Sequence, residues 1–138
     1  MHAELQNVRI PRRKREGSVL KDIIEGIALL DTVPAVGQDD GWQGKGRCAN
    51  HPDPDLWFAP IEEQSPRYAH LAQDARARAR KKDRNRAKEM CRACPVRAQC
   101  LRFSLDDPDA REWGMWAGLD KAERTKLRNM LAAKEAAA

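Results

Sequence analysis

The spacing of apolar residues along the chain predicts helices joined by polar loops. Near the N-terminus, apolar residues recur at intervals of three and four, which is typical of one face of an amphipathic helix. Ser18 can cap this helix, and we expect it to run to about Leu30. Residues 1–17 are polar and basic without such a period, so we expect a disordered tail there. The apolar face consists of Val19, Leu20, Ile23, Ile24, Ile27 and Leu30.

The middle of the chain predicts two helices that meet at a corner. Residues 67–91 contain frequent alanine and neither glycine nor proline, so we expect one long helix. Its first half has few apolar residues, which indicates a helix that protrudes or needs a partner. Pro95 disfavours the α conformation at Cys94 and suits the first turn of a new helix, expected over about 95–105.

The remaining segments predict loops and one further helix. Residues 31–47 contain five glycine or proline residues and should form a loop, and the glycines in 114–118 predict a tight turn. Asp120 and Glu123 resemble a capping box that opens a helix over about 121–135. No segment shows a convincing strand pattern, so the expected fold class is all-α. The apolar seam of the last helix is Leu127, Met130 and Leu131.

The composition indicates a small domain with a thin core. Only 5% of the 138 residues are aromatic, whereas 34% are charged. A chain of this kind often needs a metal or a disulfide as a staple. No apolar run reaches transmembrane length, and the basic N-terminus precedes no signal-peptide pattern. We therefore expect a cytoplasmic protein without a membrane partner, in a reducing compartment that disfavours structural disulfides.

The net charge of +5 is concentrated in one segment. Residues 67–88 hold nine lysines and arginines against two aspartates, whereas residues 1–66 carry a net charge of −3 and residues 89–138 one of +1. A basic segment of this kind is typical of proteins with a polyanionic partner. A solvated helix face or a disordered spacer can have the same composition, so both interpretations stay open.

The four cysteines follow the pattern C-x42-C-x2-C-x5-C, from Cys48 to Cys100. A zinc site usually combines two short pairs, whereas this chain has three clustered thiols and a remote fourth. That spacing is closer to a cubane iron–sulfur cluster, and it favours iron–sulfur over zinc. Disulfides are the third alternative, and they could form once a cluster is lost. Arg47, Arg92 and Arg97 adjoin the thiols and could offset cluster charge, although surface solubility is the simpler explanation for Arg97.

Four motifs, in order along the chain, carry a resemblance to a known family. Trp42 precedes Cys48 by six residues, and residues 53–58 read Asp-Pro-Asp-Leu-Trp-Phe. Residues 91–100 read Cys-Arg-Ala-Cys-Pro-Val-Arg-Ala-Gln-Cys, and residues 114–118 read Gly-Met-Trp-Ala-Gly. From Trp42 to about residue 130, this combination resembles the WhiB-like family of actinobacterial and actinophage iron–sulfur transcription regulators.

The resemblance implies a small four-helix domain wrapped around one [4Fe-4S] cluster per chain, with an extra N-terminal helix and flexible tails. The expected division is an N-terminal tail with a helix over 1–40, the iron–sulfur domain over 41–132 and a C-terminal tail over 133–138. A basic helical insertion at about 65–86 interrupts the domain. The implied cluster ligands are Cys48, Cys91, Cys94 and Cys100.

The resemblance also implies docking on the C-terminal region of the principal sigma factor of RNA polymerase. Aromatic residues around the cluster and the tryptophan of the turn would form that interface. The alternative, that these rings shield the cluster, is compatible with docking. The implied interface residues are Trp42, Trp57, Phe58 and Trp116, and the turn consists of Gly114, Met115, Trp116, Ala117 and Gly118.

Two departures from the family pattern change the expectations. Ala117 stands where the family turn has a glycine, and a positive φ there would cost alanine about 1 kcal/mol. The family contacts promoter DNA through basic residues after the turn, but residues 119–138 carry a net charge of only +2. We therefore expect the basic segment before Cys91 to supply much of the phosphate affinity. The candidate DNA-binding residues are Arg76, Arg78, Arg80, Lys81 and Lys82, followed by Arg124, Lys126 and Arg128.

These observations predict a transcription regulator that contacts sigma factor and promoter DNA. Its cluster either senses redox state or nitric oxide or is purely structural, and both interpretations stay open. One rival is a sigma-binding antagonist that does not read DNA. Another is a disulfide reductase using Cys91 and Cys94 after cluster loss, although no βαβ pattern surrounds this pair. The histidines are scattered, and no constellation indicates an enzyme or a small-molecule substrate.

Overall fold

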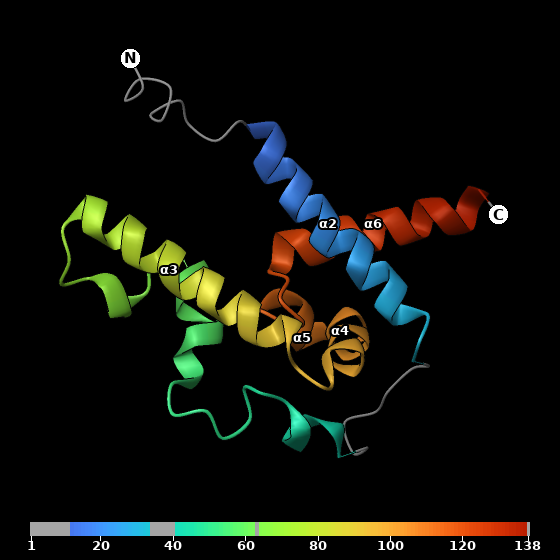
Figure 1. The fold of residues 1–138 in the computed structure, drawn as a ribbon, viewed down its shortest axis with the longest axis horizontal. Helices are drawn as coiled ribbons and strands as arrows, with labels where there is room; N and C mark the ends of the chain where they lie inside the picture. The colour runs from blue at the N-terminus through green and yellow to red at the C-terminus, as the bar shows by residue number, and fades with distance from the viewer. Residues whose placement is uncertain (1–11, 34–40, 63, 138) are drawn as a thin grey trace.

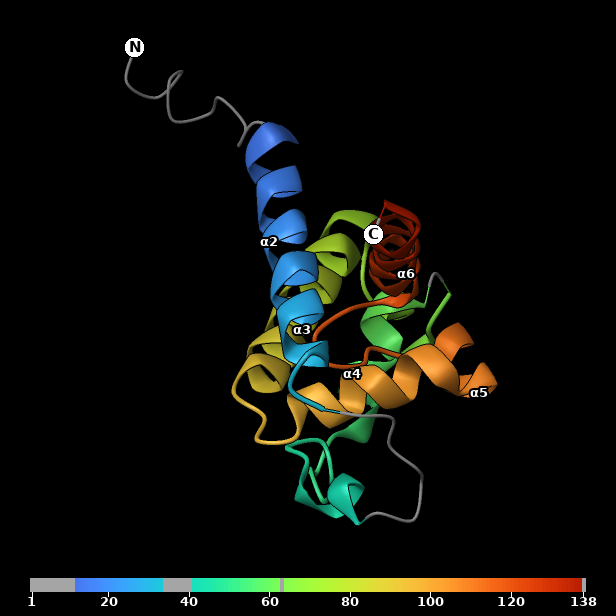
Figure 2. The same ribbon diagram turned by 90° about the vertical axis from the view of Figure 1, so that its right-hand side faces the viewer.

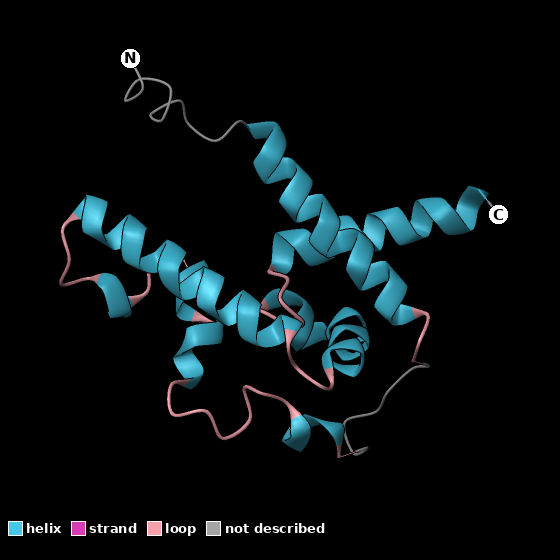
Figure 3. Cartoon of the chain, viewed as in Figure 1, coloured by secondary structure: helices cyan, strands magenta, loops and turns pink. Residues whose placement is uncertain are grey.

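A computed structural model describes residues 12–33, 41–62 and 64–137, with side chains from Leu20 onward. The regular elements in these ranges are helices joined by loops, with no strand (Figure 3), which confirms the all-α prediction. None of the described helices is long and apolar enough to cross a membrane. The α-helices are α2 (Arg12–Leu30), α3 (Gln73–Arg92), α4 (Arg97–Asp106), α5 (Pro108–Glu112) and α6 (Lys121–Ala137). The 3-10 helices are η2 (Trp42–Lys45), η3 (Pro54–Trp57), η4 (Ala59–Ile61) and η5 (Pro66–Tyr68).

Helix α2 crosses α6, and both pack near α4 (Figure 1). The apolar face of α2 enters this core through Ile23 and Leu30, whereas Leu20 and Ile24 are exposed. The helix begins at Arg12, so the predicted disordered tail is wrong for residues 12–17, where lysine, arginine and glutamate are good helix formers. Residues 1–11 lie outside the described ranges. The core between these helices contains Ile23, Leu30, Leu101, Leu105, Ala117, Leu119 and Leu127.

Two smaller apolar clusters lie on the other side of the molecule. There the segment 42–61 runs past the ends of α3 and α4 (Figure 2). Helices η3 and η4 pack on α3 and bury Trp57 against Cys91 and Met115. Trp42 of η2 is buried against α4 and α5. The cysteines therefore lie where several short elements meet.

The predicted helix over 67–91 is wrong at its N-terminal end, because α3 begins only at Gln73. The Ser65 side chain accepts a hydrogen bond from the Arg67 amide, and Pro66 opens the separate helix η5. Arg67 then binds the Asp53 carboxylate at 2.7 and 2.8 Å, and the buried Tyr68 hydroxyl donates to Asp83 at 2.8 Å. These contacts fold the chain back onto α3 before that helix begins.

The corner at Pro95 is confirmed, since α3 ends at Arg92 and α4 begins at Arg97. The capping box is also confirmed: the Glu123 amide donates to Asp120 at 2.8 Å, and the Asp120 amide donates to Glu123 at 3.0 Å. Helix α5 was not predicted. Its N-cap, Asp107, and its first residue, Pro108, are helix start signals in the sequence.

Candidate metal centre

All four cysteines line one cavity of about 190 Å³. Cys91 lies in the last turn of α3, Cys94 at the corner and Cys100 on α4, while Cys48 approaches from the loop after η2. All four are free thiols; Cys91 is buried, Cys94 and Cys100 are half-buried, and Cys48 is exposed. The structure therefore brings the remote thiol to the three clustered ones, as the sequence predicts.

The spacing of these donors suits a group larger than one ion. Within the described part of the chain, no three histidine, cysteine, aspartate or glutamate side chains are close enough together to hold a single metal ion. The cavity that the thiols line together with nine other residues, at about 190 Å³, is several times the volume of about 30 Å³ that one water takes in the liquid. Four thiols around such a space fit an iron–sulfur cluster better than a mononuclear zinc site.

Several N–H groups point at the sulfur atoms. The Trp57 indole Nε1 donates to Cys91 Sγ at 3.3 Å, and the Arg47 amide donates to Cys94 Sγ at 3.4 Å. The backbone amides of Gly118 and Ala117 lower the pKa of Cys91 and Cys100, respectively. Donors to ligand sulfur stabilise the thiolate form and tune the potential of a bound cluster.

Burial nevertheless raises the pKa of three of the thiols. Desolvation is the largest cause for Cys48, Cys91 and Cys100, and neighbouring thiols raise each pKa further. The Trp57 and Gly118 donors lower the pKa of Cys91 but do not outweigh its burial. Four thiolates at this position therefore need a cationic group between them, which the iron of a cluster would supply.

The turn over 114–118 has the strained backbone that its sequence predicts. Ala117 has φ 55°, which confirms that this position needs a positive φ, and Gly118 beside it has φ 81°. At Gly114, φ is 80°, and an added Cβ would lie 2.6 Å from the Phe58 ring. Close packing of Phe58 and positive φ together explain why glycine occupies position 114.

Three of the four aromatic residues predicted for the sigma interface line this cavity, namely Trp57, Phe58 and Trp116, whereas Trp42 packs on Phe103 outside the lining. Trp42 and Trp57 are buried, with 7% and 4% of their surface exposed. Phe58 is 38% exposed and Trp116 is half-buried, and both line the cavity. Trp113 is the most exposed large apolar side chain of the described residues, at 64%.

Arg97 does more than confer surface solubility. Its side chain is 11% exposed, lines the cavity and donates from Nε to the Ala117 carbonyl at 3.1 Å. Arg47 lines the same cavity and donates from Nε to the Ala93 carbonyl. Arg92 instead turns toward α2, where it binds Asp22. Two of the three arginines beside the ligands therefore belong to the site.

The basic residues predicted to contact DNA lie on two helices, α3 and α6. Of the set on α3, Arg78, Lys81 and Lys82 are exposed, whereas Arg76 also donates to the Leu71 carbonyl and Arg80 lies over the Tyr68 ring at 5.3 Å.

Arg124 contradicts its prediction as a DNA contact, because its side chain is fully buried. Its guanidinium donates to the carbonyls of Gly114, Leu119 and Ala110, so it fastens the turn to α5 and α6. Lys126 is exposed and Arg128 is half-buried.

Comparison with known proteins agrees with the cysteine arrangement. Residues 42–127 match the family model described as transcription factor WhiB. The redox-responsive transcriptional regulator WhiB3 of Mycolicibacterium smegmatis is 38% identical over 86 residues, covering 62% of this chain and 74% of the relative. WhiD of Streptomyces coelicolor is 37% identical over 102 residues, covering 70% and 77%. WhiB1 of Mycobacterium tuberculosis is 30% identical over 87 residues, covering 63% and 83%.

No solved structure matches the chain significantly. The family match covers more than half of the chain and includes η2 to η5, α3 to α5, the turn and the first part of α6. It also includes all four cavity-lining cysteines. The chain therefore belongs to the WhiB family of transcription factors.

Proposed function

We propose that this protein is a transcription regulator that holds one [4Fe-4S] cluster on Cys48, Cys91, Cys94 and Cys100. In this proposal the protein docks on the C-terminal region of the principal sigma factor and contacts promoter DNA. The observation that carries it is the meeting of all four thiols around one cavity, with N–H donors directed at the sulfur atoms.

A bound cluster would supply a redox-active, oxidant-sensitive centre, in keeping with the redox-responsive regulators among the relatives. The protein's own residues would control access to it. Cys48 is the exposed ligand and Cys91 is the buried one, so oxidants would approach from the Cys48 side. Trp57 covers the Cys91 side and donates to its sulfur.

The proposed sigma-factor surface is centred on Phe58 and Trp116. These two side chains line the cavity and remain partly exposed, as aromatic anchors of an interface do. The Phe103 ring lies between Trp116 and the buried Trp42, with ring centroids 5.6 Å from each. Trp42 and Trp57 would therefore support the surface from beneath, and docking would depend on an intact cysteine site.

The proposed DNA surface is the outward face of α3. Arg78, Lys81, Lys82 and Arg86 are all exposed and are spaced at three and four residues, so they share one side of the helix. Arg84 and Lys88 follow Lys81 by three and seven residues and so lie beside this face, but they are bound to carboxylates of α6. Arg86 thus joins the predicted set, whereas the inward-facing cations are used for folding.

Because Arg124 is buried, α6 exposes fewer basic residues than its sequence indicates. This favours one alternative, a sigma-binding antagonist that does not contact DNA.

A comparison of two double variants tests whether α3 or α6 contacts DNA, since each variant removes two exposed lysines. Replacing Lys81 and Lys82 by glutamine should flatten the salt dependence of DNA binding by about 0.9 per lost phosphate contact. Replacing Lys126 and Lys134 should change the slope less. Equal slopes in all three proteins would exclude the α3 surface.

Anaerobic purification tests the cluster itself. The expected result is a brown protein with four iron and four sulfide per chain that binds the sigma-factor C-terminal region. A colourless protein with one stoichiometric zinc would contradict the proposal. Binding of the sigma-factor region by cluster-free protein at full affinity would contradict the link between the cluster and docking.

A further inference from the structure

The turn over 114–118 is held from two directions. On one side it packs against the cysteines: a Cβ added at Gly118 would lie 3.5 Å from Cys91 Cβ, and the amides of Ala117 and Gly118 lower the pKa of Cys100 and Cys91. Its carbonyls at the same two residues accept hydrogen bonds from cations: Lys88 Nζ donates to Gly118 at 2.7 Å, and Arg97 Nε donates to Ala117 at 3.1 Å. The position of the amides relative to the sulfur atoms therefore depends on these two side chains.

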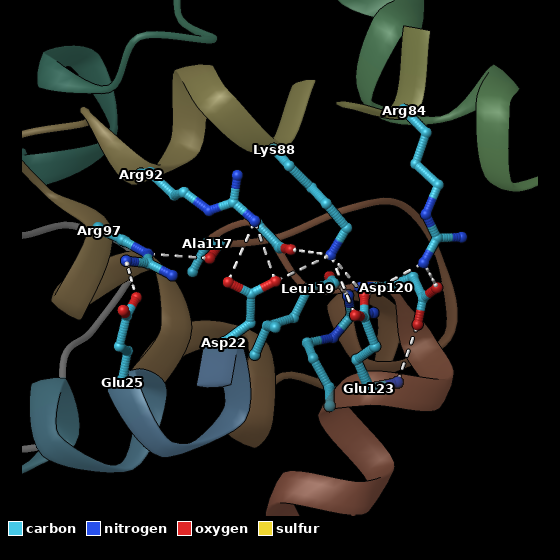
Figure 4. Close-up of polar contacts among 12 residues, drawn as sticks. Asp22, Glu25, Arg84, Lys88, Arg92, Arg97, Ala117, Leu119, Asp120 and Glu123 are labelled. Atoms are coloured by element: carbon cyan, nitrogen blue, oxygen red, sulfur yellow. Dashed lines mark hydrogen bonds and ion pairs between the residues drawn. The ribbon is translucent and has the colours of Figure 1, made fainter. Parts of the chain in front are cut away.

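Both cations are in turn bound by carboxylates of α2, which precedes the family match (Figure 4). Asp22 lies 3.7 Å from Lys88 Nζ and also accepts from Arg92 at 3.1 Å. Glu25 lies 3.6 Å from Arg97. The Asp22 and Lys88 side chains are each 9% exposed, whereas Glu25 is 42% exposed, so the Asp22 pair is the stronger of the two.

We propose that α2 is part of the cluster site, with Asp22 acting as a positioning residue through Lys88. Lys88 lies between Asp22 on α2 and Glu123 on α6, which accepts at 2.9 Å. A buried cation that loses one of two carboxylates moves toward the other, so removing the Asp22 charge would draw Lys88 toward α6. The Gly118 carbonyl would lose its alignment, and the amide facing Cys91 would shift with it.

The test compares three full-length variants loaded with cluster under anaerobic conditions. Asp22→Asn keeps the shape and removes the charge, Asp22→Glu keeps the charge, and Ile23→Val loosens the neighbouring, fully buried position without touching the ion pairs. Two quantities are measured: the rate at which visible absorption bleaches in limiting oxygen, and the midpoint of thermal unfolding.

Asp22→Asn should lose the cluster about tenfold faster, as expected when a residue supporting metal ligands is removed. Asp22→Glu should restore most of the lifetime, and Ile23→Val should lower the unfolding midpoint while keeping the wild-type bleaching rate. A wild-type rate in Asp22→Asn would overturn the inference. So would equal bleaching in Ile23→Val and Asp22→Asn at the same midpoint, because α2 would then act only as an anchor.

This inference rests on the proposed function, but the two fail differently. Wild-type protein without iron and sulfide would refute the proposed function. A fully loaded Asp22→Asn variant with an unchanged cluster lifetime would refute only the role of α2.

Discussion

The side of the molecule formed by α2, α4 and α6 differs from the cysteine side in what fills the space between its elements. On the first side, branched aliphatic residues such as Ile23, Leu101 and Leu127 are fully buried against one another. On the second, short 3-10 helices and helix ends surround a cavity of about 190 Å³ lined by thiols and rings. One side is closed by its own side chains, and the other leaves room for a bound group.

This difference indicates where the stability of each side comes from. Burial of aliphatic side chains stabilises the α2–α6 side in any state of the cysteines. The cysteine side keeps thiols whose pKa values are raised by burial, so its thiolate form would need the charge of the proposed cluster. We infer that cluster loss loosens one side far more than the other.

The largest expected effect is that of Cys91→Ser. It removes the most buried ligand, together with the acceptor of the Trp57 indole hydrogen bond. We expect near-complete loss of iron after anaerobic purification, because a hard hydroxyl replaces a thiolate. Helical circular dichroism should fall only in part, since the α2–α6 core remains. Full iron content in this variant would contradict the claim that Cys91 holds the bound group on the cysteine side.

Leu127→Ala tests the other side. Leu127 is fully buried in the α2–α6 core, so its truncation should cost about 2–5 kcal/mol of unfolding free energy. The cost should be similar with and without cluster, and the iron content of the folded protein should match wild type. Urea unfolding of both forms, with iron analysis, measures this. A selective loss of iron would show that packing of the aliphatic core, and not only the ion pairs of α2, controls the cysteine side.

Gly114→Ala examines the turn between the two sides. The added Cβ would lie 2.6 Å from the Phe58 ring at φ 80°, so we expect a cost of about 2 kcal/mol. Gly44→Ala is the matched control, because nothing lies within 4 Å of its Cβ. Thermal unfolding should separate the two variants clearly. Equal unfolding midpoints would mean that the Phe58 ring moves aside without a cost in stability, and that its packing on Gly114 does not constrain the turn.

The smallest expected effect concerns pH. The hydrogen bonds from Arg67 hold the pKa of Asp53 below its usual value of 3.8. A carboxyl with a lowered folded-state pKa contributes stability above its unfolded pKa and loses it as the pH falls through the folded pKa. Asp53→Asn should therefore be slightly less stable than wild type at pH 6, with the gap closing below about pH 4. A stability difference that stays constant across this pH range would show that Asp53 does not contribute to the loss of stability in acid.

Local rules predicted the parts of the fold that depend on neighbouring residues. Pro95 breaks the helix at the corner, Asp120 and Glu123 form the capping box, and Ala117 has a positive φ. The meeting of Cys48 with Cys91, Cys94 and Cys100 agrees with the thiol count and spacing. Each of these inferences depends only on the geometry of neighbouring residues or on the number of ligands that one bound cluster requires.

The errors about the basic residues come from charges that are paired across long distances in the sequence. Arg67, Arg84 and Lys88 appear in the sequence as part of a basic segment, but they bind carboxylates of other elements. Arg124 was expected to face DNA and is fully buried on carbonyls of the turn. A sequence shows the net charge of a segment, whereas only the fold shows which cations are already used.

Hydrogen exchange, resolved by peptide and compared between cluster-loaded and cluster-free protein, tests the central claim most directly. We predict that cluster loss removes protection over residues 42–61 and 91–100, while residues 20–30 and 121–131 keep most of theirs. Equal loss of protection on both sides, or unchanged protection over the cysteine side, would contradict the claim that the group held by the four thiols fastens that side.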